Sequence, residues 1–92
     1  FRPPYGRIKF AQIKAIKEAM GSDLKIIMWD ILTGDYDSAT SPEDCLENSI
    51  KHTQNGSIVV FHDSLKAKKN MQYALPKYIQ YFRDKGYSFA TL

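Results

Sequence analysis

The fold predicted for this sequence depends mainly on the stretch Ile58-Val59-Val60-Phe61-His62-Asp63. Four consecutive apolar residues follow the turn pair Asn55-Gly56, and such a run is typical of a short strand that is buried on both faces. The run ends on His62 and Asp63, which are costly to bury without a partner. In α/β folds, ligands and catalytic groups gather at the carboxyl ends of parallel strands. His62 is therefore a candidate catalytic imidazole, and the alternative is a structural histidine that hydrogen-bonds to a neighbouring loop.

Composition limits the class of protein. The 92 residues suffice for one small domain, and 43% hydrophobic with 25% charged residues is ordinary for a globular chain. The net charge of +3 is modest, and the only basic run is Lys66-Ala67-Lys68-Lys69. This run favours a solvated loop over a nucleic-acid site, because binding along a phosphate backbone needs a broader patch. No apolar run reaches the length of a membrane span, and no signal peptide opens the chain. The single cysteine, Cys45, cannot form an internal disulfide.

Three segments show helical patterns. Apolar residues recur at three- and four-residue steps from Ile8 to Met20, which predicts an amphipathic helix. Ser41-Pro42-Glu43-Asp44 predicts a second helix start, with a hydroxyl cap, proline at the first helical position and acidic residues in the first turn. A third pattern runs from about Gln72 to Lys85, with Gly86 as its C-terminal cap. Pro76 must lie in the first turn of that helix or kink it.

Two further apolar runs predict strands. Leu24–Trp29 would end at Asp30, and Tyr87–Leu92 would close the chain. Strands that alternate with helices predict an α/β fold of βαβ units with parallel strands. The polar segment Ile31–Ser41, which carries Asp35, is long for a connection in a compact domain, and loops of this length are often functional.

Three stretches carry motifs in a fixed order: Arg2-Pro3-Pro4-Tyr5-Gly6, then Trp29-Asp30 through Asp35-Tyr36, then Val60-Phe61-His62-Asp63. Together they resemble the polysaccharide deacetylase family (carbohydrate esterase family 4). They are similar to its arginine–proline–aromatic, W-D-x-x-x-x-D-W and L-x-H-D motifs, with a helix between each pair of motifs. Two positions depart from the pattern, since Tyr36 stands where tryptophan is usual and Val60 where leucine is usual.

The resemblance covers the second half of that domain. It implies that residues 1–92 are a C-terminal portion, a partial arc of a distorted (β/α) barrel, and that the metal-binding N-terminal half is absent. Family members bind a divalent metal ion, expected to be zinc, through an aspartate and an H-x-x-x-H pair in that half. Here the only histidines are His52 and His62, on different elements, so we expect no metal ligand within this chain.

The resemblance also implies partners and a location. It implies an acetylated polysaccharide as substrate and an extracytoplasmic or cell-envelope location, although no export signal is visible. An arc of a barrel leaves one sheet edge open, and open edges are sticky, so we expect that copies of this chain can associate through it. Nucleic acid and a membrane span are not expected.

The same resemblance gives three residues a catalytic role. His62 would be the general acid that gives a proton to the departing amine, and Asp35 would be the carboxylate that favours the charged imidazole. Arg2 would pair with the catalytic base of the missing half and keep it ionised.

Three more residues would contact the substrate. The backbone N–H of Tyr5 would point at the oxyanion, and Tyr36 and Val60 would line the pocket for the acetyl methyl group. Asp63 more simply caps a loop, and Asp30 is either a hydrogen-bond acceptor at a strand end or a second partner in the site.

Two alternatives stay open. A non-catalytic carbohydrate-binding or assembly module of the same fold would use Tyr5, Tyr36 and Tyr73 to stack on sugar rings. An O-acetyl esterase that acts on xylan would use the same residues as the N-deacetylase. In either enzymatic case we expect the isolated chain to be inactive, because it lacks the metal and the base.

Overall fold

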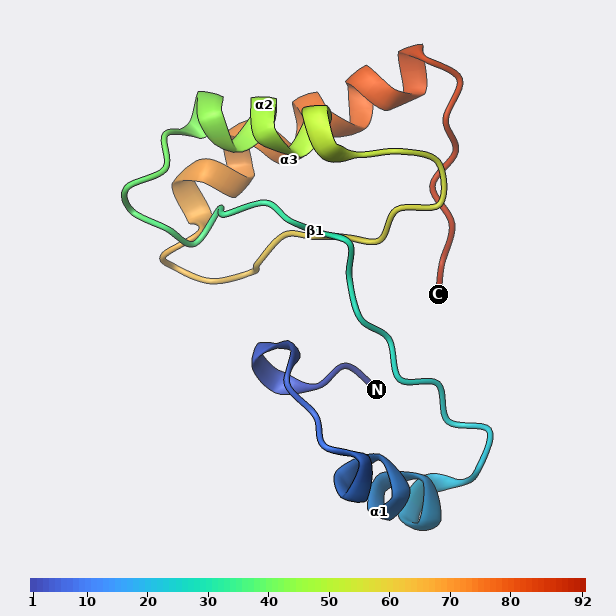
Figure 1. Ribbon diagram of the computed structural model, residues 1–92. Coiled ribbons are helices and arrows are strands. Elements are labelled where there is room, and N and C mark those ends of the chain that lie inside the picture. The colour runs from blue at the N-terminus through green and yellow to red at the C-terminus, as the bar shows by residue number, and fades with distance from the viewer.

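The computed structural model describes residues 1–92 and contains one short 3-10 helix, three α-helices and two short strands. In chain order they are η1 (Pro4–Gly6), α1 (Phe10–Met20), β1 (Ile31–Leu32), α2 (Pro42–His52), β2 (Val59–Val60) and α3 (Lys68–Asp84). Figure 1 shows α2 and α3 side by side on one side of the strand pair, with η1 and α1 on the other side. None of the helices has the length and apolar character that a membrane crossing requires.

The two strands pair in parallel, with Ile31 opposite Val59 and Leu32 opposite Val60. With α2 between them they form one βαβ unit, and β2 has no second strand partner. Two strands do not define a barrel, so the partial (β/α) barrel stays a prediction.

Both further strand predictions are wrong. Residues 24–29 are irregular, and the chain enters the strand pair only at Ile31. Residues 87–92 are irregular as well. An apolar run becomes a strand only when a neighbouring strand satisfies its backbone hydrogen bonds, and neither run has such a neighbour in this structure.

Helix α2 starts as the sequence predicts. The Oγ of Ser41 accepts a hydrogen bond from the backbone N–H of Asp44 at 3.0 Å, Pro42 is the first helical residue, and Glu43 and Asp44 occupy the first turn. The buried side chains Cys45 and Ser49 face inward from this helix.

Helix α3 is longer than predicted, because it begins at Lys68 and includes part of the segment expected to be a polar loop. Pro76 lies in its interior rather than in its first turn. The helix ends in a Schellman motif, in which Gly86 (φ +82°) donates to Arg83 O and Tyr87 donates to Phe82 O. This ending is the predicted one.

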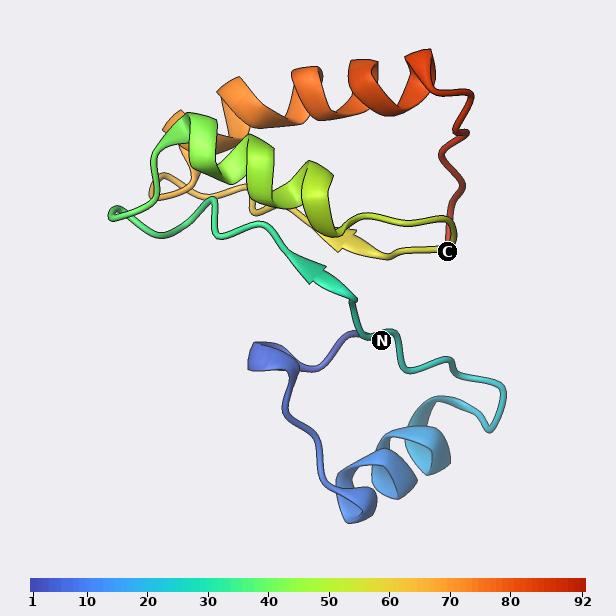
Figure 2. The same ribbon diagram turned by 45° about the horizontal axis from the view of Figure 1, so that its top comes forward.

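The chain divides into an N-terminal arm, residues 1–30, and a C-terminal body, residues 31–92. In Figure 2 the arm, with α1, extends away from the strands and from the other two helices. The radius of gyration is 15.4 Å, whereas a compact chain of this length has about 12 Å. The accessible surface is 7088 Å², against roughly 5,500 Å² for a compact protein of this mass.

Candidate active site

The site lies where the two parallel strands end. Asp35 follows β1 after a turn in which Gly34 adopts a φ of +73°, and His62 follows β2. Thr33 holds the two chain segments together at this point, because its N–H and its Oγ1 both donate to the carbonyl of Val60, at 3.4 and 2.9 Å. The neighbouring carboxyl ends of the strands therefore place Asp35 beside His62.

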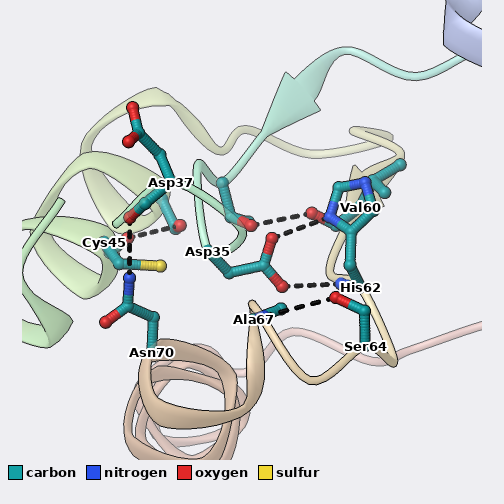
Figure 3. A network of polar contacts seen from close by, with 10 residues as sticks. Asp35, Asp37, Cys45, Val60, His62, Ser64, Ala67 and Asn70 are labelled. Carbon is teal, nitrogen blue, oxygen red and sulfur yellow. Dashed lines mark hydrogen bonds and ion pairs between the residues drawn. The ribbon is translucent and has the colours of Figure 1, made fainter. Parts of the chain in front are cut away.

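One carboxylate fixes both the backbone and the ring of His62. Oδ2 of Asp35 accepts the backbone N–H of His62 at 2.6 Å, and Oδ1 lies 2.7 Å from the ring Nδ1 (Figure 3). Since a carboxylate only accepts, Nδ1 carries a proton and donates it, which leaves Nε2 as the free ring nitrogen. Asp35 is 0% exposed, whereas the His62 side chain is 37% exposed. The pair therefore has a buried, orienting end and a solvent-facing, reactive end.

Cys45 lies beside this pair, fully buried on α2. Burial, and secondly the negative charge of Asp35, raise the pKa of the Cys45 thiol above its ordinary value of 9.0. The thiol therefore stays neutral near physiological pH, and it lines the site as a small apolar group rather than as a nucleophile.

A buried asparagine supports the loop that carries Asp35. Asn70, in the first turn of α3, is 5% exposed, and its Nδ2 donates to Thr40 O at 2.9 Å and to Asp37 O at 3.4 Å. This amide ties α3 to the segment that follows Asp35 (Figure 3). Neither Asn70 nor Thr33 is among the predicted site residues, because Asn70 precedes the predicted helix start at about Gln72 and Thr33 lies in the segment expected to be a loop. If the helical pattern is extended back to Lys68, it places Asn70 in the first turn of the helix.

Tyr36 and Val60 also lie near the imidazole. The Tyr36 ring meets the His62 ring edge-on, with 4.9 Å between their centroids, and is 42% exposed. Val60 is 9% exposed and carries the carbonyl that Thr33 binds. Four of the predicted site residues, His62, Asp35, Tyr36 and Val60, therefore come together at one end of the strand pair.

Arg2 and Tyr5 are not part of this cluster. The guanidinium carbon of Arg2 lies 6.0 Å from the Trp29 ring centroid, and the side chain lines a cavity of about 560 Å³ whose wall includes β2, α3 and the C-terminal segment. Tyr5 is 94% exposed, and neither residue makes a hydrogen bond or ion pair with His62 or Asp35. The structure thus places Arg2 and Tyr5 away from the His62–Asp35 pair.

The first motif nevertheless has a defined local structure. Tyr5 has a φ of +55°, in the left-handed region that costs a non-glycine residue roughly 1–2 kcal/mol. The Cβ that any other residue would add at Gly6 would lie 2.7 Å from the Trp29 ring, so glycine is required there. The motif therefore packs on Trp29, the first residue of the second motif.

The remaining carboxylates lie away from the imidazole. Asp30 is a strand-end acceptor, because its Oδ2 accepts the backbone N–H of Ile58 at 2.7 Å at the amino end of the strand pair. Asp63 is exposed and makes no side-chain hydrogen bond. Nowhere does the chain bring together three histidine, cysteine, aspartate or glutamate side chains that could hold a metal ion.

The chain is similar to a peptidoglycan-N-acetylglucosamine deacetylase from Bacillus cereus. The two sequences are 30% identical over 93 aligned residues, which is all of this chain and 42% of the relative. The chain therefore spans less than half the length of this curated relative. No family model matches the sequence. The similarity supports a relationship to polysaccharide deacetylases, and it agrees with the class that the three motifs resemble.

Proposed function

We propose that this chain supplies the proton-donating part of a polysaccharide deacetylase that hydrolyses N-acetyl groups of amino-sugar polymers. The observation that carries the proposal is the contact between His62 and Asp35 at the carboxyl ends of the parallel strands. The similarity to a peptidoglycan-N-acetylglucosamine deacetylase makes N-acetylglucosamine units of a glycan the first substrate to test.

In this proposal His62 is the general acid. After water adds to the amide carbonyl, the C–N bond of the tetrahedral intermediate breaks and its electron pair stays on nitrogen. That nitrogen takes a proton from Nε2 of His62 in its doubly protonated, cationic form, because an amine is a poor leaving group unless it is protonated, and His62 is left as a neutral imidazole with its proton on Nδ1. Asp35 keeps its hydrogen bond to Nδ1 throughout and so holds the ring in one orientation.

Tyr36 and Val60 would form the wall for the acetyl methyl group. The Tyr36 ring meets the His62 ring edge-on, and Val60, on β2, lies two residues before His62 and is 9% exposed. Tyr36 is 42% exposed and adds a hydroxyl where the family usually has an indole, so we expect this pocket to be more open and more polar than is usual.

The activation of water and the polarisation of the carbonyl would come from residues outside this chain. A divalent metal ion is the expected agent, and this chain contains no group of three side chains that could hold one by itself. Arg2 makes no ion pair within the chain. In this proposal it would pair with a carboxylate of those outside residues.

The test is a comparison of two histidine variants in the full-length protein that carries this chain. We expect His62→Ala to lower kcat for acetate release about 10²- to 10⁴-fold, the usual contribution of a general acid. His52→Ala is the matched control, since His52 is exposed on α2, and it should leave the rate unchanged. Should H62A release acetate at the parent rate, the assignment of His62 is wrong. The isolated 92 residues should release none in either form.

A non-catalytic carbohydrate-binding module is the second candidate. The specific observation in its favour is that Arg2 and Tyr5 lie outside the His62 cluster, so the predicted catalytic set is incomplete within this chain. A full-length protein that binds chitooligosaccharides but releases no acetate with any divalent metal would establish this reading.

A further inference from the structure

The turn between α2 and β2 carries an asparagine followed by a glycine. Gln54, Asn55, Gly56 and Ser57 form a β-turn, because the N–H of Ser57 donates to Gln54 O at 3.1 Å. Gly56, the third residue of this turn, has a φ of +83°. A positive φ at the third position alone is typical of a type II turn. Both central residues, Asn55 and Gly56, are exposed.

The peptide bond between Asn55 and Gly56 can rotate. The hydrogen bond of a β-turn joins its first and fourth residues, so the central peptide takes no part in it. The carbonyl of Asn55, the N–H of Gly56 and the Asn55 side chain make no other hydrogen bond. Glycine adopts positive and negative φ almost equally, and beyond its chain neighbours no atom lies within 4 Å of the position that a Cβ would take at Gly56. Rotation of this peptide therefore breaks no hydrogen bond.

A free peptide of this kind permits an intramolecular reaction. Rotation brings the backbone nitrogen of Gly56 to Cγ of the Asn55 side chain, and nearness in the same molecule replaces a collision. The nitrogen bonds to Cγ and loses its proton, the bond from Cγ to the amide nitrogen breaks, and ammonia leaves. A cyclic imide remains. Water then adds to either imide carbonyl, so the ring opens to aspartate or to isoaspartate, in which the main chain runs through the side-chain carbons.

The other two asparagines lack this freedom. Asn48 lies inside α2, and Asn70 lies in the first turn of α3. The nitrogen that would attack Asn70 belongs to Met71, whose N–H donates to Ala67 O at 2.8 Å. The Asn70 side chain is bound as well, since its Nδ2 donates to Thr40 O at 2.9 Å. At both positions a helix would have to open before the ring could close.

The turn leads directly into the hydrogen bonds that hold β2 beside β1. The N–H of Ile58 donates to Asp30 Oδ2 at 2.7 Å, and Ile58 O accepts the N–H groups of Asp30 and Ile31 at 2.9 and 3.2 Å. Isoaspartate lengthens the main chain just before these bonds and adds a negative charge. We propose that Asn55 is a site of spontaneous deamidation through a cyclic imide with Gly56, and that the isoaspartate product loosens the amino end of the strand pair. The proposal rests on the turn and not on the proposed function.

The test ages the full-length protein that carries this chain at mildly alkaline pH, where the Gly56 nitrogen loses its proton more readily. The protein is then digested, and mass spectrometry with synthetic standards separates asparagine, aspartate and isoaspartate peptides. We expect the Asn55 peptide to gain the mass by which water exceeds ammonia and to contain both acidic products. The Asn48 and Asn70 peptides are the internal controls, and they should convert at least about tenfold more slowly, because helices open less often than an exposed turn.

Three outcomes would overturn the modification site. An Asn55 peptide that keeps its mass would show that the ring does not close. Aspartate without isoaspartate would show direct hydrolysis of the side chain rather than a cyclic imide. Conversion of all three asparagines at one rate would show that the turn confers no reactivity of its own.

Two variants test the structural consequence. Asn55→Gln keeps an amide but needs a larger ring, so it should resist ageing, and Asn55→Asp adds the charge without lengthening the main chain. We expect the urea midpoint of the aged parent to fall below those of the fresh parent and of Asn55→Asp, while aged Asn55→Gln keeps its fresh midpoint. An unchanged midpoint in parent protein rich in isoaspartate would overturn the loosening of the strand pair. An equal fall in aged Asn55→Gln would overturn it too, because the loss would then come from another residue.

Discussion

The N-terminal arm and the C-terminal body contain similar helices but differ in what those helices bury. Of the 12 buried residues, all but Pro3 lie in the body. Helix α1 buries none of its side chains, and Phe10 and Met20 are 90% and 70% exposed. Helix α3 buries Ala74, Tyr78 and Phe82 among others. The two helices therefore share an amphipathic pattern, but only α3 packs its apolar side chains into a core.

The two regions also differ in how they are tied to the rest of the chain. The arm is hydrogen-bonded to the body at Asp30, whose N–H donates to Ile58 O at 2.9 Å and whose Oδ2 accepts the N–H of Ile58 at 2.7 Å. Its other bonds, such as Ile27 N–H to Phe1 O, and the packing of Gly6 on Trp29 lie within the arm itself. In the body, an aromatic series from Phe61 through Tyr78 and Phe82 to Tyr87 links β2 to α3, and Thr53 bonds to the Tyr78 hydroxyl at 2.7 Å. We expect the body to carry nearly all of the stability.

A pair of phenylalanine truncations gives the largest contrast. Phe82→Ala should lower the free energy of unfolding by about 3–5 kcal/mol, because Phe82 is 4% exposed and its removal leaves a cavity. Phe10→Ala should change it by less than about 0.5 kcal/mol, because Phe10 already contacts water. Urea denaturation followed by circular dichroism measures both. Equal losses would mean that α1 is packed in solution and that the two regions do not differ.

An amide inside the body gives a smaller effect with a local readout. Asn70→Ala should cost about 1–2 kcal/mol, since it leaves the Thr40 carbonyl without its donor, whereas the Asp37 carbonyl keeps the backbone N–H of Thr40. The loosened loop should also let the Nδ1 proton of His62 exchange with water faster, which proton NMR detects. Gln72→Ala removes an amide from an exposed position of the same helix and should do neither. Unchanged exchange in N70A would limit Asn70 to a packing role.

The same comparison explains which features the sequence could predict. Helix α2 and the end of α3 were predictable because Ser41, Pro42 and Gly86 act through hydrogen bonds to near neighbours. The contact of Asp35 with His62 follows from the parallel strands, whose carboxyl ends must be adjacent.

Features that depend on distant partners were not predictable. The run at residues 24–29 and the run at residues 87–92 have strand composition, but a strand needs a neighbour that the sequence pattern cannot supply. The position of Arg2 likewise depends on a distant partner, the Trp29 ring, whose centroid lies 6.0 Å from its guanidinium carbon. The catalytic role of Arg2 stays a prediction for the same reason.

The smallest expected effect is the contribution of Cys45 to the pH dependence of stability, which tests whether water reaches the interior of the body. Burial and the charge of Asp35 raise the pKa of Cys45 in the folded chain, while the unfolded chain keeps a pKa near the ordinary 9.0. Above pH 9 the unfolded state therefore loses a proton that the folded state retains, so the free energy of unfolding must fall as pH rises. Below pH 9 both states hold the proton, and the contribution is constant.

The measurement compares the parent with Cys45→Ala by urea denaturation from about pH 8 to about pH 10. The cavity left by C45A costs the same at every pH, and the tyrosines and lysines are present in both proteins. A difference in the free energy of unfolding between parent and C45A that narrows as pH rises therefore reports the Cys45 thiol. A difference that stays constant would mean that water reaches Cys45. Asp35 would then be hydrated as well, and the contrast between a buried, orienting carboxylate and a solvent-facing imidazole would not hold.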